Sequence, residues 1–598
     1  MKQNYPILII LVLSLLIGSI TLADYGESWD DYSLQKYAAY SLRTYNTWRT
    51  QGIMPITSND LGNYGPSYVM AVSLGSRLLS YISPLDPPDN RHIVYFITHL
   101  VGIWAFYELG KRWLTTTAAL YATLLFATQP LFWGHAFINP KDTPFLVFFL
   151  LSLLFGFRMV DWMGRLKQPE PGIRWLGILT ILGVVTIFGL FAFPNLIHDW
   201  ITSLVNSAKS GGTNIISLLA SDINKVQPEV YIQKYFILFL HTRAIYFFAT
   251  VSLLFFINRR YNPKLSLIVQ SVHSSVVIPA IILGFTTSIR ILGPFAGLIV
   301  SLYAFHKHGK RALAPLMTYV LVAIIGTYVT WPYLWSDPIG HFIGSLQTMS
   351  KYPWYGTVLF NGVEYSPADL PNTYLPVLLA VQFTEPIWVL FIVGAARAVI
   401  KHKEKWELLG LTGIWFVLPL IGFIVMRVAL YDNFRQIFFI LPPIFLLAGL
   451  GLESALKWLN QPRFTAAIVG LVVLPGLIAG IRLHPYEYVY YNALVKYPNE
   501  RFELDYWAIS YREAAEYVNE VAPANTNIMV IGPGQVADLH IREDLTVLSD
   551  DEQVTEPFDY VISTTRYNFG TELYPDAEIV HSIERNGMLL TVVKKVKE

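Results

Sequence analysis

The chain has 598 residues, of which 54% are hydrophobic and only 14% are charged. A soluble globular protein carries roughly 25% charged residues, so this composition indicates an integral membrane protein rather than one large soluble core. The net charge of +1 gives no electrostatic reason to expect a nucleic-acid partner. Because cysteine is absent, disulfides, thiol catalysis and thiolate metal sites are excluded.

Thirteen apolar segments are long enough, or nearly long enough, to cross a bilayer. In chain order they are Ile7–Ala23, His92–Gly110, Thr116–Trp133, Thr143–Val160, Trp175–Phe193, Tyr235–Ile257, Val276–Ile289, Leu292–Phe305, Ala314–Trp331, Pro386–Ile400, Leu408–Val425, Phe434–Leu450 and Phe464–Ile481. We interpret the first as a retained helix. The alternative is a cleaved signal peptide, and both interpretations place Asp24 onward on the non-cytoplasmic side.

The basic connectors support this count, because with thirteen spans they all fall on the side where the chain starts. They are Lys111-Arg112, the run Arg158/Arg165/Lys167/Arg174, Arg259-Arg260 with Lys264, His306–Arg311, Lys401–Lys405, and Lys457 with Arg463. Pro66–Ser83 is also moderately apolar, but it contains Arg77, and counting it as a span would place the later basic loops outside. We therefore predict that it lies at the membrane interface.

The stretch from Val276 to Phe305 is too short for two full spans with a loop between them. It fits two short helices that meet at Arg290–Pro294. An arginine at membrane depth is costly and is usually paired or faces an aqueous cavity. Arg290 is therefore a candidate functional residue.

Polarity rises after Arg482, and the tail predicts a small α/β domain. A helix is expected at Tyr511–Val521. Strands are expected at Asn527–Gly532, Leu545–Leu548, Tyr560–Ser563, Ile579–Ile583 and Met588–Val593, the last two as a hairpin around Asn586-Gly587. The predicted fold is mainly α: a membrane domain over residues 1–481, whose first outer loop (24–91) carries interfacial helices, followed by a non-cytoplasmic α/β domain over residues 482–598.

Several charged residues are expected on the non-cytoplasmic side. Asp30 and Asp31 follow the first span, and such a pair can act as a general base, bind a metal or hold a cation; the alternative is solvated loop charges. Asp142 is expected at the outer end of a span, where it can also act as a helix N-cap. Lys141 beside it can simply extend to the interface. His135 is a candidate acid, base or metal ligand, or a structural residue.

These motifs, taken together, resemble the GT-C membrane glycosyltransferases, in particular the branch of protein O-mannosyltransferases and aminoarabinose transferases. The matching residues are Asp30-Asp31, Lys141-Asp142, Thr287–Pro294, Tyr352-Pro353-Trp354 with Leu359–Gly362, Tyr431–Arg435 and Leu441-Pro442-Pro443. The resemblance covers roughly Trp29 to Ala455, and its specificity comes from the order and the membrane side of the motifs.

The resemblance implies an enzyme that transfers a sugar from a polyprenyl-phosphate donor to an acceptor hydroxyl. It assigns Asp30 as the base or acceptor-positioning acid, with Asp31 beside it where the family usually has Glu, and Asp142 as the second acid. Arg290, Arg435 and Lys141 are the expected donor-phosphate ligands, since cationic side chains suit phosphate. The family differs in its use of a divalent metal, which Asp30, Asp142 and His135 would bind if it is present.

The implied partners are membrane lipid, the lipid-linked donor and a glycan, lipid or protein acceptor. The implied location is a prokaryotic plasma membrane, with the site and the tail outside. Two other classes stay open at this point. A transporter or lipid flippase predicts charges paired within spans and an internal inverted repeat, which the sequence does not show. A non-catalytic scaffold predicts that the acids are dispensable.

Overall fold

The computed structural model describes residues 5–52, 60–166, 174–220, 225–261, 270–352, 354–549 and 556–596. Three residues of the predicted features, Lys167, Lys264 and Pro353, lie outside these ranges. The chain forms two compact units, and each is described by itself. The first comprises Met1–Gln35, Ala71–Leu150 and Lys351–Glu598, and the second comprises Lys36–Met70 and Leu151–Ser350.

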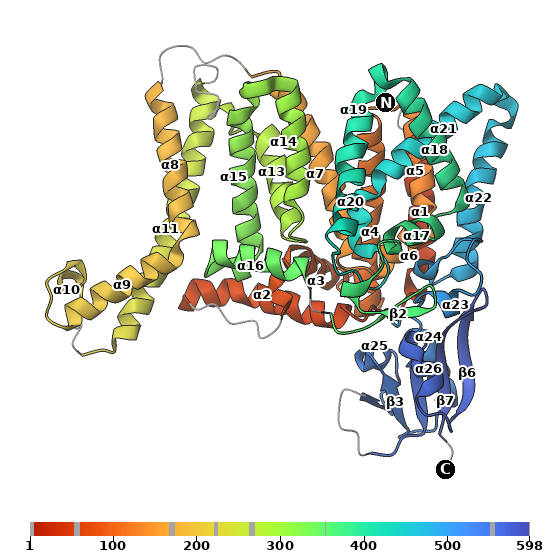
Figure 1. Ribbon diagram of the computed structural model, residues 1–598. Helices are drawn as coiled ribbons and strands as arrows, with labels where there is room; N and C mark the ends of the chain where they lie inside the picture. Colours follow the sequence, from red (N-terminus) through yellow and green to blue (C-terminus); the bar gives the residue numbers. More distant parts are fainter. Residues whose placement is uncertain are drawn as a thin grey trace. The chain divides into compact units, whose positions relative to one another are not determined.

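Helices dominate both units, with the strands concentrated in the tail, so the predicted mainly α fold with a small C-terminal α/β domain is confirmed (Figure 1). The membrane part of the first unit contains α1 (Tyr5–Thr21), α4 (Pro87–Gly110), α5 (Thr116–Ala127), α6 (Pro130–Ile138), α17 (Tyr374–Val381), α18 (Glu385–Ile400), α19 (His402–Thr412), α20 (Leu418–Val425), α21 (Pro442–Leu459) and α22 (Thr465–Leu483). The second unit contains α8 (Arg174–Ala192), α9 (Pro194–Lys209), α10 (Ile215–Leu219), α11 (Pro228–Tyr261), α13 (Ser274–Thr287), α14 (Pro294–His308), α15 (Leu313–Thr330) and α16 (Pro338–Ser350). Unit boundaries fall within α2 (Asp31–Gln51), α3 (Ser67–Leu79) and α7 (Asp142–Met163).

Each of the thirteen predicted apolar segments overlaps a helix. By length and composition, seven helices in the described ranges can cross a membrane, or eight if the pair α17–α18, bent by 107°, is one span. The chain is thus an integral membrane protein, and the count of thirteen spans stays a prediction. Helix α3 has 13 residues and spans only about 20 Å, too short to cross a bilayer.

Two predicted spans differ in detail from the structure. Thr116–Trp133 is broken into α5 and α6, because Gln129 is extended (ψ 123°) before Pro130, whose ring disfavours a helical conformation in the preceding residue. Phe434–Leu450 is not one helix: a short 3₁₀ segment, Arg435–Ile440, precedes α21. Helix α21 begins at Pro442, and proline suits this first position because it needs no hydrogen-bonded N–H there.

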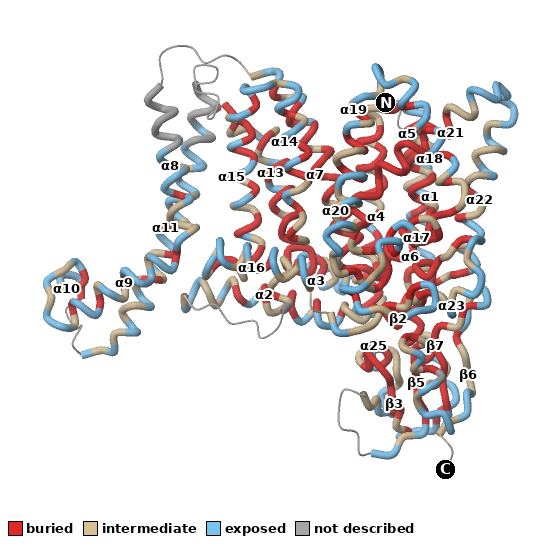
Figure 2. Tube along the Cα trace, viewed as in Figure 1, coloured by how far each residue is buried: buried red, intermediate tan, exposed pale blue. Residues whose placement is uncertain are grey.

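Helices α18 and α21 pack with their backbones in close contact, and α21 is buried along most of its length (Figure 2). Glycine permits this approach on both sides. A methyl group added at Gly394 would lie 1.8 Å from the carbonyl oxygen of Leu447, and one at Gly451 would lie 2.0 Å from that of Leu390. Small residues at such a crossing are typical of membrane helix pairs, because they let the backbones make van der Waals contact.

The tail folds around a five-stranded sheet of order β4-β3-β5-β7-β6. The strands are β3 (Asn527–Ile531), β4 (Thr546–Ser549), β5 (Tyr560–Thr564), β6 (Glu578–Arg585) and β7 (Met588–Lys595); the helices beside them are α24 (Tyr511–Val521), α25 (Gly534–Asp538) and α26 (Phe569–Glu572). Strands β4, β3 and β5 are parallel, and β7 pairs antiparallel with both β5 and β6. The helix and all five strands predicted for the tail are present.

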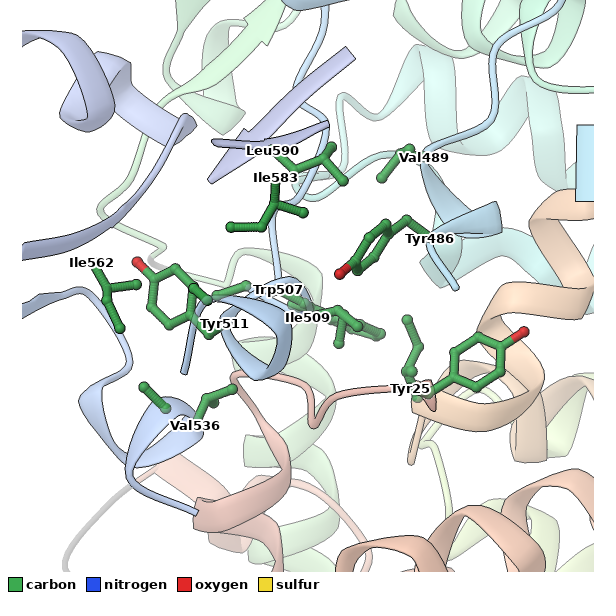
Figure 3. Close-up of a cluster of buried hydrophobic side chains, with 14 of the residues drawn as sticks. Tyr25, Tyr486, Val489, Trp507, Ile509, Tyr511, Val536, Ile562, Ile583 and Leu590 are labelled. Atoms are coloured by element: carbon green, nitrogen blue, oxygen red, sulfur yellow. The ribbon is translucent and has the colours of Figure 1, made fainter. Parts of the chain in front are cut away.

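The core of the tail continues into the loop that follows α1. Figure 3 shows Tyr25 of that loop in one cluster with Tyr486, Trp507 and Tyr511. Arg512 on α24 donates to the backbone carbonyl of Tyr25, at 3.0 Å. The division into residues 1–481 and 482–598 stays a prediction, since the contacts group the tail in one unit with residues 1–35 and 71–150.

We expect Gly394→Ala and Gly451→Ala to lower the melting temperature of the purified protein in detergent. The added methyl group must push α18 and α21 apart, and overpacking of this kind costs typically about 1–3 kcal/mol. Gly410→Ala is the matched control, because a methyl group there would meet nothing within 4 Å. Equal melting temperatures for Gly394→Ala and Gly410→Ala would contradict the tight crossing.

Candidate active site

Asp30 lies in the turn that leads into α2. The N–H of Trp29 before it donates to the carbonyl of Trp507 at 3.1 Å, which fixes this turn against the tail. The carboxylate of Asp30 is 3.1 Å from Nζ of Lys141, and its side chain keeps 30% of its surface exposed. Burial alone would raise the pKa of Asp30, but the charges of Lys141 and Arg435 outweigh it, and the pKa lies below its ordinary value. Asp30 is therefore an ionised carboxylate with part of its surface accessible.

Asp31, the next residue, is in a different environment. Its side chain is 3% exposed and lies 2.8 Å from Nε of Arg91 on α4. Tyr95 donates its hydroxyl to the other carboxylate oxygen at 2.6 Å. Glu27 binds the same guanidinium at 2.7 Å. Asp31 thus joins the start of α2 to α4.

The turn before α7 places Lys141 and Asp142 side by side. The side-chain oxygen of Asn139 accepts from the backbone N–H of Lys141 at 3.0 Å and of Asp142 at 2.7 Å. Asn139 is therefore the residue that caps α7 with its side chain, and Asp142 is left to bind other groups. Asp142 is buried, and its carboxylate accepts from Arg435 at 2.8 Å.

A buried chain of alternating charges runs from Asp142 to the tail. Arg435 donates one terminal nitrogen to Asp142 and the other to Asp432, at 2.8 and 3.0 Å. Arg566 of the tail donates to the second oxygen of Asp432 at 2.7 Å and to the carbonyl of Tyr506 at 2.8 Å. Burial lowers the pKa of Arg435, whereas the negative charges of Asp142 and Asp432 raise it. The charges outweigh burial, and the pKa lies well above its ordinary value. We call Asp142, Arg435, Asp432 and Arg566 the ion chain.

His135 on α6 is fully buried beside this chain. Since the oxygen of the Asn139 amide already accepts two backbone N–H groups, its nitrogen faces Nδ1 of His135 at 3.1 Å. Nδ1 then accepts, and Nε2 donates to the hydroxyl of Tyr506 at 3.0 Å. Both ring nitrogens are occupied, so the structure favours the structural interpretation of His135.

The expected metal ligands do not fit a metal in this arrangement. Asp30 is held by Lys141 and Asp142 by Arg435, while both nitrogens of His135 have protein partners. In the described ranges, no group of three or more Asp, Glu or His side chains is placed to hold a metal ion. A metal would need these cations to be displaced first.

The expected phosphate ligands lie in three settings. Lys141 is 15% exposed beside Asp30, whereas Arg435 is 3% exposed and already binds two carboxylates. Arg290 lies in the second unit, partly exposed, in the turn between α13 and α14. The phosphate-binding role of all three stays a prediction, and the geometry of the first unit favours Lys141 over Arg435.

The second unit contains an apolar cavity of about 710 Å³ between α8, α11, α14, α15 and α16. Phe191, Ile324, Tyr328 and Phe342 are among the residues that line it. Next to two of these residues, Arg243 on α11 is buried, with its guanidinium 4.6 Å from the ring centre of Phe191 and 3.1 Å from the hydroxyl of Tyr328. The cavity is lined almost entirely by carbon atoms.

Sequence reasoning missed the residues that the tail contributes. Arg566 is a member of the ion chain, and Tyr506 and Trp507 contact it, with the guanidinium of Arg435 4.7 Å from the indole of Trp507. No local pattern marks them, because their side-chain hydrogen-bond partners are 60 to 371 residues away in sequence. One usable signal was the pair of adjacent large aromatic residues, Tyr506 and Trp507, because such side chains are usually buried.

A comparison with known families matches residues 90–193 to the family described as dolichyl-phosphate-mannose-protein mannosyltransferase. The heme-binding subunit MsrQ of protein-methionine-sulfoxide reductase from Bordetella pertussis is 40% identical over 62 residues, which are 10% of this chain. That match spans only 30% of the length of this curated relative.

Among solved structures, ArnT from Cupriavidus metallidurans in the apo state aligns over 98% of this chain and 97% of its own, with 12% identity and a TM-score of 0.47. The Archaeoglobus fulgidus oligosaccharyltransferase aligns over 94% of this chain and 69% of its own, with 13% identity and a TM-score of 0.38. Similarities this weak carry no conclusion about this chain. The family match does: it covers His135, Lys141 and Asp142, and there it confirms the resemblance to protein O-mannosyltransferases predicted from the sequence.

Proposed function

We propose that this integral membrane protein is a glycosyltransferase that moves a sugar from a polyprenyl-phosphate donor to an acceptor hydroxyl on the non-cytoplasmic face. The observation that carries the proposal is the accessibility of Asp30. Its side chain is 30% exposed, while those of Asp31, Asp142 and Asp432 are 3%, 1% and 6% exposed and held by arginines. A general base must reach the proton that it removes, and in this cluster Asp30 meets that condition.

The proposed reaction is a single displacement. Asp30 takes the proton from the acceptor hydroxyl as the oxygen attacks the anomeric carbon, and the bond to the polyprenyl phosphate breaks with its electrons moving to the phosphate. Lys141, beside Asp30, stabilises the charge that develops on the leaving phosphate. Asp142 and Arg435 hold the turn that positions Lys141, since Asp142 follows it directly in the chain.

The apolar cavity of the second unit suits the hydrocarbon chain of such a donor. Isoprenoid chains have no polar groups, and a pocket lined by Phe191, Ile324 and Phe342 offers them no unsatisfied hydrogen-bonding partner. The guanidinium of Arg243 adds a buried positive charge, which favours an anionic lipid over a neutral one. We propose that this cavity binds an isoprenoid lipid chain.

The charged groups argue against the alternative of a transporter. A proton or ion pathway needs a series of ionisable groups within the spans, whereas Asp30, Lys141 and Asp432 lie in turns and loops outside the helices. Arg243 on α11 does lie within a span, and the proposal assigns it to the lipid. A scaffold without catalytic activity has no need for an accessible carboxylate held beside a lysine. The proposal and the scaffold alternative differ in one measurable property, the effect of Asp30 on transfer.

Asp30→Asn is expected to lower the transfer rate about 10²- to 10⁴-fold, the usual contribution of a general base, without loss of stability. Asp31→Asn is expected to destabilise the protein instead, because it leaves Arg91 without one of its two carboxylates. Transfer from a radiolabelled polyprenyl-phosphate sugar and the melting temperature are measured for both variants. Asp86→Asn, at an exposed aspartate of the same loop, is the control. An unchanged rate for Asp30→Asn would reject Asp30 as the base.

Lys141→Met is expected to move the acid limb of the pH profile of kcat/KM to higher pH. The positive charge keeps the pKa of Asp30 below its ordinary value, so the wild-type base stays ionised as the pH falls. Without that charge the carboxylate is protonated at a higher pH, and activity is lost earlier on acidification. Lys496→Met, at an exposed lysine of the tail, should leave the limb where it is. An acid limb that does not move in Lys141→Met would contradict the pairing.

Ile324→Trp is expected to reduce the amount of polyprenyl phosphate that copurifies with the protein, because the larger side chain fills the apolar cavity. Leu313→Trp, on the same helix and almost equally exposed (48% against 49%), does not line the cavity and serves as the control. Lipid extracts of both variants are quantified by mass spectrometry. Equal amounts of lipid in the two variants would show that the polyprenyl lipid does not bind in this cavity.

A further inference from the structure

A second cavity, of about 190 Å³, lies in the first unit between the tail and the hairpin of β1 (Val358–Phe360) and β2 (Val363–Tyr365). Backbone contacts hold the hairpin against the tail. The N–H of Gly362 donates to the carbonyl of Arg501 at 3.2 Å, and Phe360 forms an antiparallel β-bridge with Phe502. The volume is enough for several water molecules, and so for one small polar ligand. We call it the hairpin cavity.

Glu503 is the most unusual residue of the hairpin cavity. Its side chain is 8% exposed, and Oε2 has no hydrogen-bond partner among the described residues. Oε1 is 3.7 Å from Arg566, too far for a strong hydrogen bond. Burial raises the pKa of Glu503 above its ordinary value, although the charge of Arg566 and a hydrogen bond from the backbone of Leu359 act the other way. The shift favours the protonated carboxyl group, which both donates and accepts. A buried polar atom without a partner indicates a ligand or water at that point.

The backbone at the cavity edge is strained. Tyr567 and Asn568 both have positive φ, 54° and 58°, in consecutive positions without glycine. A bulky aromatic residue in this region is a true outlier, and such strain persists only where the surroundings hold it. Here the ring of Tyr567 stacks on the guanidinium of Arg566 at 4.9 Å and meets Phe569 at 5.2 Å. The strain places the side chains of Tyr567 and Asn568 in the cavity lining.

The lining selects against an anion. The residues that line the hairpin cavity include three acids, Glu364, Glu503 and Asp505, and one arginine, Arg566, which already binds Asp432. The lining also offers few free carboxyl oxygens as ligands for a metal cation. Asp505 is occupied by Ser510 and Tyr488, and Glu364 accepts from Thr357 at 2.9 Å. Among the described lining residues, Oε2 of Glu503 is the one buried carboxyl oxygen without a hydrogen-bond partner.

What remains suits a neutral or amino-bearing polyhydroxyl compound. The lining residues include the hydroxyl-bearing Thr357, Thr565 and Tyr567, the amides Asn499 and Asn568, and the aromatic ring of Phe502. Of these groups, the hydroxyl of Thr357 also donates to Glu364 at 2.9 Å, and the amide of Asn499 to the carbonyl of Leu589 at 2.8 Å. Groups that both donate and accept, beside an aromatic face, match the hydroxyls and the C–H face of a pyranose ring. We propose that the hairpin cavity binds one sugar ring of the acceptor, uncharged or carrying an amine, and so selects a glycan or glycolipid acceptor.

This inference rests on the proposed transferase function, and the ion chain connects the two. Arg566 lines the hairpin cavity and binds Asp432, which binds Arg435 and through it Asp142 beside Lys141. A ligand that contacts Arg566 therefore acts on the chain that holds the candidate active site. The tail, in this assignment, contributes acceptor specificity.

The test is saturation-transfer NMR on the full-length protein in detergent micelles, with D-glucose, D-glucosamine and D-glucuronate as three similar pyranoses of different charge. We expect saturation transfer to glucose and glucosamine but not to glucuronate. Leu589→Trp on β7, which fills the cavity, is expected to abolish the signal, and Ile579→Trp on the exposed edge strand β6 is the matched control that keeps it. Size-exclusion chromatography verifies that both variants are folded.

A second pair of variants tests Glu503 without changing its size. Glu503→Gln keeps a donor and an acceptor and should retain glucose binding, whereas Glu503→Met keeps the volume and should lose it. Asp30→Asn should bind glucose like the wild type. No saturation transfer to any of the three sugars, a signal unaffected by Leu589→Trp, or an equal signal from glucuronate would each overturn the inference. Transferase activity without sugar binding would overturn this inference alone, and sugar binding with an inactive wild-type enzyme would overturn the proposed function alone.

Discussion

The structure of the first unit depends on the pairing of buried charges. Asp142, Arg435, Asp432 and Arg566 alternate in sign, and each is nearly inaccessible to solvent. Charges taken out of water cost several kcal/mol each unless every one has a partner, so removal of any member leaves an uncompensated charge beside its neighbour. The cluster therefore fixes where α7, the segment before α21 and the tail meet, and it leaves Asp30 as the carboxylate with free surface.

The tail is part of this arrangement and not an appended module. Its arginines act at two places: Arg566 ends the ion chain, and Arg512 binds both Tyr25 and Asp89, each at 3.0 Å. The apolar cluster of Figure 3 adds contacts between the same segments. The tail is thus held to the segment after α1 by both charge and apolar packing. It also binds the backbone of Trp29, which fixes the position of Asp30.

Local patterns were enough to predict the elements, and they were not enough to predict the partners. Hydrophobic periodicity and turn residues located α24, the five strands of the tail and a helix at each predicted span, because these signals act over a few residues. The break before Pro130 and the start of α21 at Pro442 were also readable in principle from proline. Arg566 could not be found this way, since its partner Asp432 is 134 residues away and no short-range sequence pattern links residues at that separation.

The adjacent residues Asp30 and Asp31 show why residue type alone could not separate base from structural acid. The sequence predicts the same chemistry for both, and only their surroundings differ. Successive side chains at the start of a helix point in directions about 100° apart, so Asp31 turns to Arg91 and Tyr95 on α4 while Asp30 turns to Lys141. One carboxylate is buried by two strong partners, and the other keeps a single lysine and open surface. The distinction between them is thus a property of the packed helices, and it is this distinction that makes a catalytic assignment to Asp30 testable.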